Sequence, residues 1–261
     1  MLYDIQEADD RLEKDIKKPK RLIWAFLIFV VFVLLLIVPK CVNAWIKFHI
    51  PKVSFYDNTP TNIFDKPVQK MYSYKNSQLK VFKYKSLKKD IYATITPQAY
   101  YKISGQVVAY NTYLPEHYGF DYIALYDIGM VWGKLAQSDF FKENCSAKSE
   151  EYVEARMLNI NCPNYEQTLS KLGYSWMEFE ALISHTHIVP ANYNIIAALN
   201  TIKKYDTIEL EGELVNVKVD GEVNEHLSSL TREDDNGSAI GGGACEIMYV
   251  KKVKIGNKVY Q

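Results

Sequence analysis

Two histidines stand two residues apart in the segment HTHIVPA (185–191), which has the extended character of a strand ending at Pro190. Side chains at such spacing point to the same face of a strand, so His185 and His187 present their imidazoles together. Two such rings could share a metal ion, with a third ligand from elsewhere in the chain: His226, Asp234, Cys245 or Glu246. No third ligand stands at a diagnostic spacing, so we interpret the pair as ordinary hydrogen-bonded histidines and expect no metal or cofactor.

A second group of reactive side chains lies in the polar, glycine-rich run SSLTREDDNGSAIGGGACE (228–246). Its glycines at 241–243 could present backbone N–H groups to an anion, and Arg232 could hold a carboxylate or phosphate with two parallel hydrogen bonds. The run lacks the P-loop pattern, and no helical pattern follows it. We therefore expect a long turn between strands, in which Arg232 bonds Asp234, Asp235 or Glu246.

These two segments supply the candidate ligand or structural cluster, which consists of His187, Arg232, Asp234, Cys245 and Glu246. Ser228, Ser229 and His226 could instead suggest a hydrolase, but no nucleophile-elbow context surrounds them. We assign no catalytic residue, and an enzyme is the less favoured interpretation.

The elements that must position this cluster are mainly strands. Alternation of apolar and polar residues predicts strands at 91–95, at 101–110 with a bulge at Gly105, at 152–158, at 207–219 with a bulge near Gly212, and at 245–255 before a terminal hairpin. Helices are expected in two fragments of 164–183 split by Gly173, and after an Asn192 cap. Strands with few helices favour a small mixed barrel with inserted helices, for which an OB-like barrel is one candidate.

The chain has four cysteines, of which Cys145, Cys162 and Cys245 follow the apolar segment described next. An oxidising compartment would allow a disulfide there. Cys145 and Cys162 flank a compact segment, and we predict that they form the bridge.

The stretch Leu22–Val38 is apolar throughout and contains no charge, glycine or proline. As a helix it is about 25 Å long, so a flanking turn would let it cross a hydrocarbon core of about 30 Å. Lys17, Lys18, Lys20 and Arg21 crowd its N-terminal side, which by the positive-inside bias keeps residues 1–21 in the cytoplasm. A cleaved signal peptide is the alternative, but the apolar core is longer than that of a typical signal.

The expected organisation is therefore a cytoplasmic N-terminus (1–21), a transmembrane helix (22–38), a proline-containing stalk or wrapping arm (39–78) and a β-rich α+β extracytoplasmic domain (79–261). The expected location is the inner (cytoplasmic) membrane, with the domain on its outer side. The net charge is zero, which argues against a nucleic-acid partner.

The C-terminal part resembles an uncharacterised group of bacterial single-pass membrane proteins. The resemblance covers about the last 160 residues and is carried by YKISGQVV (101–108), HIVPAN (187–192), KKYDTIELEGELVNV (203–217), SSLTRED (228–234) and GGGACEI (241–247). Arg232, Asp234, Cys245 and Glu246 fall on the shared pattern. The resemblance implies a membrane-anchored bacterial protein and supplies no activity.

Two functional hypotheses follow. In the favoured one, the extracytoplasmic domain binds another protein or a second copy of itself within a membrane complex. In the alternative, the domain is an anchored enzyme or a small-ligand or metal-binding domain that uses the five-residue cluster. Convergence of those side chains in one place would favour the alternative.

Overall fold

The computed structural model describes residues 26–33, 36–73, 81–113, 119–137, 139–152, 155–230 and 245–261. Arg232, Asp234 and Gly241–Gly243 lie outside these ranges, so their expected contacts stay predictions. The chain divides into two compact units, Met1–Phe48 and His49–Gln261, each of which is described by itself.

Among the residues that the structure describes, one helix, Phe26–His49, is long and apolar enough to cross a membrane. Apolar side chains on it, such as Phe26 and Ile28, are exposed. The helix continues past Pro39, so the first part of the predicted 39–78 stalk is helical rather than extended. A proline removes one helical hydrogen bond, and residues 40–49 contain no further proline or glycine that would end the helix.

Residues 50–73 form an arm at the start of the second unit, where they pair with other strands of the same unit. Strand β1 (Phe55–Tyr56) pairs with β11 (Lys258–Tyr260), and β2 (Val68–Met71) pairs with β4 (Tyr92–Thr112). Of the two alternatives for this segment, the described residues therefore form a wrapping arm rather than a free stalk.

The second unit is built on a large, mostly antiparallel sheet that closes on itself. Besides the strands already described, this sheet contains β3 (Phe82–Lys85), β5 (Tyr126–Val131), β8 (Ile183–Pro190), β9 (Thr207–Val219) and β10 (Glu246–Ile255). The pairs β4–β5, β5–β8, β8–β10, β10–β9 and β9–β4 complete a ring, in which only β8 and β10 run parallel.

The inside of this ring is identified by side chains that meet across it. The Tyr101 hydroxyl on β4 donates to Glu246 Oε1 on β10 at 3.1 Å, although these strands lie on opposite sides of β9. Thr186 on β8 is also within 3.5 Å of Glu246. Because neighbouring residues of a strand face opposite sides, Cys245, His185 and His187 lie on the outer face of the ring.

The two strands predicted at 91–95 and 101–110 are one continuous strand, β4. Pro97 is accommodated because the register shifts there, between Pro97 and Ala99. The bulge predicted at Gly105 lies instead between Val107 and Ala109. Gly105 is needed because the backbone of β5 is close to it: a Cβ there would lie 2.4 Å from a carbonyl oxygen of β5. The irregularity expected near Gly212 occurs on the partner strand, between Val250 and Lys252.

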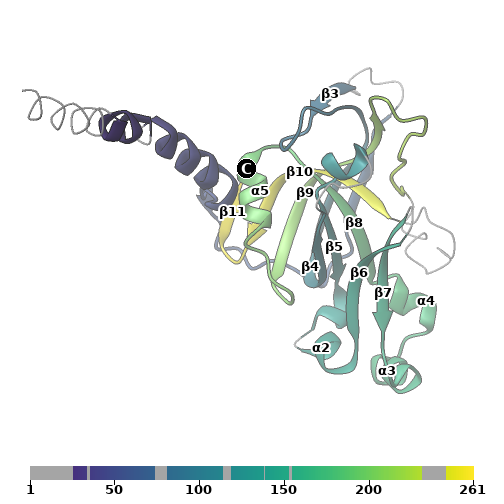
Figure 1. Cartoon of the computed structure of the whole chain (residues 1–261). Coiled ribbons are helices and arrows are strands. Elements are labelled where there is room, and N and C mark those ends of the chain that lie inside the picture. The colour runs from purple at the N-terminus through teal and green to yellow at the C-terminus, as the bar shows by residue number, and fades with distance from the viewer. Residues whose placement is uncertain are drawn as a thin grey trace, which may run out of the picture. The chain divides into compact units, whose positions relative to one another are not determined.

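An insertion between β5 and β8 carries most of the short helices (Figure 1). It contains the 3-10 helix η2 (Gly133–Ala136), α2 (Phe140–Asn144), the antiparallel hairpin of β6 (Ser146–Tyr152) and β7 (Ala155–Asn161), α3 (Tyr165–Leu172) and α4 (Trp176–Glu180). The prediction of a single strand at 152–158 is wrong: Tyr152 ends β6, and residues 155–158 form the first half of the antiparallel partner β7. Gly173, with φ of 68°, separates α3 from α4 as predicted.

A disulfide joins Cys145 to Cys162, the pair predicted from the sequence. These residues immediately precede β6 and follow β7, where Ser146 pairs with Asn161. The bridge therefore closes the open end of the hairpin.

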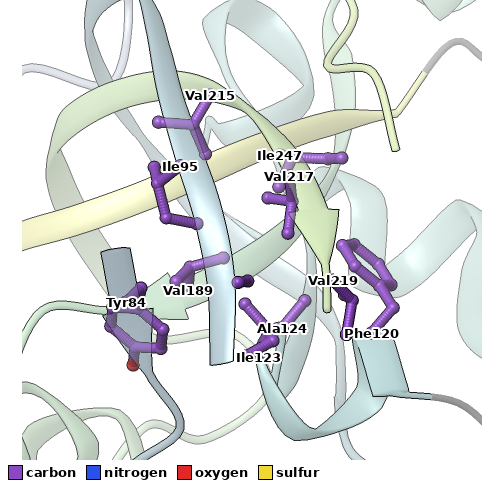
Figure 2. Close-up of a cluster of buried hydrophobic side chains, with 11 residues drawn as sticks. Tyr84, Ile95, Phe120, Ile123, Ala124, Val189, Val215, Val217, Val219 and Ile247 are labelled. Atoms are coloured by element: carbon purple, nitrogen blue, oxygen red, sulfur yellow. The ribbon is translucent and has the colours of Figure 1, made fainter. Parts of the chain in front are cut away.

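A buried apolar cluster covers part of the outer face of the ring. Figure 2 shows Val189 and Ile247, which share a face with His187 and Cys245 by strand alternation, packed with side chains from β3, β9 and the segment after the 3-10 helix η1 (Gly119–Tyr122). The helix α5 (Tyr193–Leu199) follows β8 and is capped by Asn192, whose side chain accepts hydrogen bonds from two backbone N–H groups as predicted. The outer face of β8 is thus packed at Val189, next to the histidines.

Candidate functional site

Backbone pairing brings the thiol of Cys245 beside the two histidines. Glu246 pairs with Thr186 in the parallel β8–β10 ladder, so the preceding Cys245 lies next to His185. In the antiparallel β5–β8 ladder, Asp127 pairs directly with His187. Three adjacent strands therefore place a thiol, two imidazoles and a carboxylate on one patch of the outer face.

The sulfur atom of Cys245 and one nitrogen atom from each of His185 and His187 lie close together. His185 Nδ1 lies 3.1 Å from Cys245 Sγ. One donor atom from each residue lies within 4.8 Å of the other two, as the ligands of a metal ion would. Because His187 Nδ1 is bonded to Asp127, Nε2 is the nitrogen that remains for a metal ion.

Asp127 orients both rings. Its Oδ1 lies 2.6 Å from His187 Nδ1, and its Oδ2 lies 3.5 Å from His185 Nε2. The Ser149 hydroxyl, on β6, donates to Oδ2 at 3.4 Å. Each imidazole thus uses one nitrogen on the carboxylate and turns the other toward Cys245, an arrangement that fixes ring orientation around metal ions.

Arg156, on β7, supplies the positive charge that faces this carboxylate. One guanidinium nitrogen donates to Asp127 Oδ1 at 3.1 Å and to the Ala124 carbonyl at 2.9 Å, while the other donates to Asp121 and also to Ala124. The guanidinium carbon lies 3.8 Å from the centre of the Tyr113 ring. With the side chains of Arg156 and Asp121 each 7% exposed and that of Asp127 fully buried, the pairing is desolvated.

These contacts shift the protonation of every group in the patch. Burial raises the pKa of the Cys245 thiol, but the hydrogen bonds and charges of His185 and His187 outweigh it and bring that pKa to about 6. Burial lowers the pKa of His185, and the bonds to Asp127 and Cys245 reverse the effect and raise it to about 10. Burial raises the pKa of Asp127, yet His187, His185 and Arg156 hold it well below its usual range. These contacts therefore favour the thiolate form of Cys245 at neutral pH.

The predicted cluster is brought together only in part. His187 and Cys245 meet, whereas Glu246 lies inside the ring with Tyr101 and Thr186. Arg232 and Asp234 lie outside the described residues. His226, an expected remote ligand, bonds Glu222 at 2.9 Å and stacks on Phe120 instead.

Sequence reasoning missed Asp127, Arg156, Asp121 and Ser149. Asp127 could have been noticed in the sequence, since it is the one charged residue in the apolar run that forms β5. The structure shows that it is fully buried. A charge in such a strand needs a partner, which could have pointed to a site. Arg156 and Ser149 left no comparable signal, because their role depends on the hairpin folding back over β5 and β8.

A thiolate and two imidazoles with a shared carboxylate behind them can do two kinds of chemistry. They can bind a transition-metal ion that favours sulfur and nitrogen, such as zinc or copper. Cys245 with His185 could also act as a nucleophile and base, but that leaves the equivalent placement of His187 without a role. The symmetric arrangement of the rings favours metal binding.

No family model, curated protein or solved structure matches this chain. Function is therefore inferred from the geometry of the patch and from the apolar N-terminal helix.

Proposed function

We propose that this protein is a single-pass membrane protein whose extracytoplasmic domain binds one transition-metal ion through Cys245 Sγ, His185 Nδ1 and His187 Nε2. The observation that carries the proposal is the convergence of these three donors, with the second nitrogen of each ring on Asp127. The apolar helix Phe26–His49 supports the membrane anchor. The excess of lysine and arginine before it supports the cytoplasmic N-terminus and inner-membrane location.

We also propose that the domain is an OB-like barrel. In the chain order β4, β5, β8, β9, β10, the ring pairs the first strand with the second and fourth, and the third with the fifth in parallel. OB-folds have five strands and bind ligands on the face of the second and third strands and the adjoining loops. Here that face is formed by β5 and β8, which carry Asp127, His185 and His187. The proposed metal site and the proposed fold thus support each other.

The test is a zinc competition experiment with a coloured chelator, using the full chain in detergent micelles. We expect one zinc ion per chain. Removing even the hydrogen-bond partner of a ligand costs roughly 10–100-fold in metal affinity, so Cys245→Ser and His187→Gln should cost more than that. His226→Gln is the matched control and should bind zinc as the wild type does. Failure of the wild type to bind, or equal binding by all variants, would contradict the proposal.

Binding of another protein is a second proposal, and an exposed aromatic surface on the insertion favours it. Tyr165 and Trp176 are 44% and 41% exposed, and Met177 beside them is 63% exposed. A shallow, open depression lies beside Tyr165, Trp176 and Cys162. Exposed aromatic and methionine side chains are typical of interface centres.

The proposal is tested with a photo-crosslinking residue at position 177 in intact membranes. We expect one defined adduct from this position. The matched control is position 223, where Val223 is 92% exposed outside the aromatic surface. Equal adducts from both positions, or none from either, would contradict specific binding through this surface.

A further inference from the structure

The β6–β7 hairpin holds the carboxylate that orients both imidazoles of the proposed metal site. Ser149 on β6 donates to Asp127 Oδ2 at 3.4 Å, and Arg156 on β7 donates to Asp127 Oδ1 at 3.1 Å. The same guanidinium bonds Asp121 and the Ala124 carbonyl, so it ties the hairpin to the segment before β5. The contacts that fix the hairpin in place therefore also fix the hydrogen-bond partners of the carboxylate.

The backbone of this hairpin forms a sheet of its own. Among the described strands, β6 and β7 pair with each other, from Ser146 with Asn161 to Tyr152 with Ala155, and neither is hydrogen-bonded into the nine-stranded sheet. A two-stranded hairpin by itself is only marginally stable in water. Its position over the ring therefore depends on the contacts of its side chains and on the covalent bridge.

The bridge between Cys145 and Cys162 closes the end of the hairpin that lies away from Tyr152. Cys145 belongs to a buried apolar cluster with Phe141 of α2 and Leu135 of η2, and Cys162 packs against the same cluster. With the bridge intact, the two strands cannot separate at this end and are held to the insertion as one unit. Reduction removes that covalent constraint.

The two sulfur atoms of the bridge differ in their access to a reductant. Cys162 is half-buried and borders the open depression beside Tyr165 and Trp176, whereas Cys145 is only 6% exposed. Thiol–disulfide exchange requires access to one sulfur atom, and exposed bridges are the ones that are readily reduced. A thiolate therefore attacks at Cys162 Sγ.

The exchange balances with a dithiol as the reductant. Its first thiolate attacks Cys162 Sγ and forms a mixed disulfide, while the bond to Cys145 breaks and the Cys145 sulfur takes up a proton. The second thiol of the reductant then displaces Cys162, which also takes up a proton. The bridge gains two electrons and two protons, and the dithiol loses the same number as it becomes a disulfide.

We propose that the Cys145–Cys162 bridge is a redox-sensitive latch that controls how tightly the domain holds its metal ion. Reduction by a dithiol loosens the hairpin, weakens the hold of Ser149 and Arg156 on Asp127, and thereby lowers the metal affinity. This inference rests on the proposed metal-binding function and names a regulation of that site. Because the two equilibria are linked, the bound metal must in turn favour the oxidised bridge.

The test compares the zinc affinity of the full chain with and without the bridge, in detergent micelles and with a coloured chelator as competitor. Cys145→Ala/Cys162→Ala stands for the reduced state without adding thiols that could bind zinc themselves. We expect it to bind zinc about 10-fold more weakly than the oxidised wild type, the lower end of the loss seen when a ligand loses its hydrogen-bond partner. Asp57→Asn is the matched control, since it weakens the arm at Lys254 and leaves the hairpin intact, and it should keep the wild-type affinity.

A second measurement uses the folded wild type and does not depend on the stability of the double variant. Two molecules of glutathione take the place of the dithiol, at a fixed ratio of reduced to oxidised glutathione and a fixed concentration of free zinc. Alkylation and peptide mass analysis give the fraction of Cys145 and Cys162 that is reduced. Zinc should shift this fraction toward the bridge in the wild type. It should not do so in Cys245→Ser, which lacks one of the proposed ligands.

The outcomes separate the two proposals. Equal zinc affinity with and without the bridge, or a reduced fraction that zinc does not change, would overturn the latch and leave metal binding intact. An equal loss of affinity in Asp57→Asn would show that the bridge acts only through global stability, which would also overturn the latch. Failure of the oxidised wild type to bind zinc would overturn the metal-binding function, and the latch with it.

Discussion

Asp127 is the residue on which the geometry of the centre depends, because one buried carboxylate sets the direction of both imidazoles. Its own placement comes from pairing with His187 across β5 and β8 and from the guanidinium of Arg156. A carboxylate without such partners would be costly to bury in an apolar strand. Asp127, Arg156 and the histidines therefore form one interdependent unit.

We predict that Asp127→Asn weakens metal binding by about 10–100-fold, because an amide cannot accept hydrogen bonds from both rings on two oxygens. Zinc competition in the full chain measures the effect. Asp139→Asn is the matched control, since the Asp139 side chain is 62% exposed and lies 3.7 Å from the Lys142 amine. Unchanged affinity in Asp127→Asn would mean that the carboxylate does not orient the ligands.

At the scale of elements, the β6–β7 hairpin completes the site that the ring strands begin. It brings Ser149 and Arg156 over β5, and Leu158 packs so closely on Gly129 that a Cβ there would lie 2.8 Å from it. The disulfide closes the open end of this hairpin. The insertion therefore acts as a cover whose position depends on both covalent and ionic contacts.

Removing the bridge should destabilise the domain. For a loop of this length, with Cys145 and Cys162 separated by 17 positions, the expected loss of unfolding free energy is about 3 kcal/mol. Chemical denaturation of the Cys145→Ala/Cys162→Ala double variant, compared with the oxidised wild type, measures it. Cys41→Ala is the control, since Cys41 is exposed and free. A double variant as stable as the wild type would show that the bridge contributes nothing to stability.

The arm of residues 50–73 is a second element held by a charge. The Lys254 amine, in a side chain only 3% exposed, donates to Asp57 Oδ2 and to the Thr59 carbonyl, each at 2.6 Å. The bond from Lys254, followed by the Thr59 backbone N–H, lowers the pKa of Asp57. A carboxyl with a depressed folded pKa adds stability above its unfolded pKa and loses it as the pH falls.

We therefore predict that Asp57→Asn unfolds at lower denaturant concentration than the wild type at pH 7. The difference should shrink once the pH falls below about 4, where the unfolded carboxyl is protonated. Denaturation curves of both proteins across this range provide the measurement. A difference that does not change with pH would show that the charge of Asp57 does not hold the arm.

At the scale of the whole molecule, local patterns predicted the elements better than their assembly. The β9 strand, the Asn192 cap and the break at Gly173 are local, and the structure has them where the sequence indicates. The site needs Cys245, His185 and Asp127 on three strands, with Arg156 from the insertion. No spacing in the chain encodes those contacts, because ring closure and the hairpin create them. For the same reason the sequence predicts one cluster that contains both Cys245 and Glu246, although strand alternation points the Glu246 side chain to the inside of the ring.

The topology of the chain gives a prediction at this scale. A C-terminal alkaline phosphatase fusion should be active and a C-terminal fusion to a fluorescent protein that matures only in the cytoplasm should be dark, because the basic residues before the helix hold residues 1–21 inside. Replacing Lys17, Lys18, Lys20 and Arg21 with glutamine should reduce this bias. The opposite pair of signals from the wild type would contradict the orientation.

The central claim is that a thiolate and two imidazoles bind one metal ion, and X-ray absorption at the zinc edge tests it most directly. The zinc-loaded full chain should show one sulfur at about 2.3 Å and two imidazole nitrogens at about 2.0–2.1 Å, with a light atom in the remaining position. In Cys245→Ser the sulfur scatterer should disappear. A first shell of nitrogen and oxygen alone in the wild type would contradict the assignment of Cys245, His185 and His187 as the metal centre.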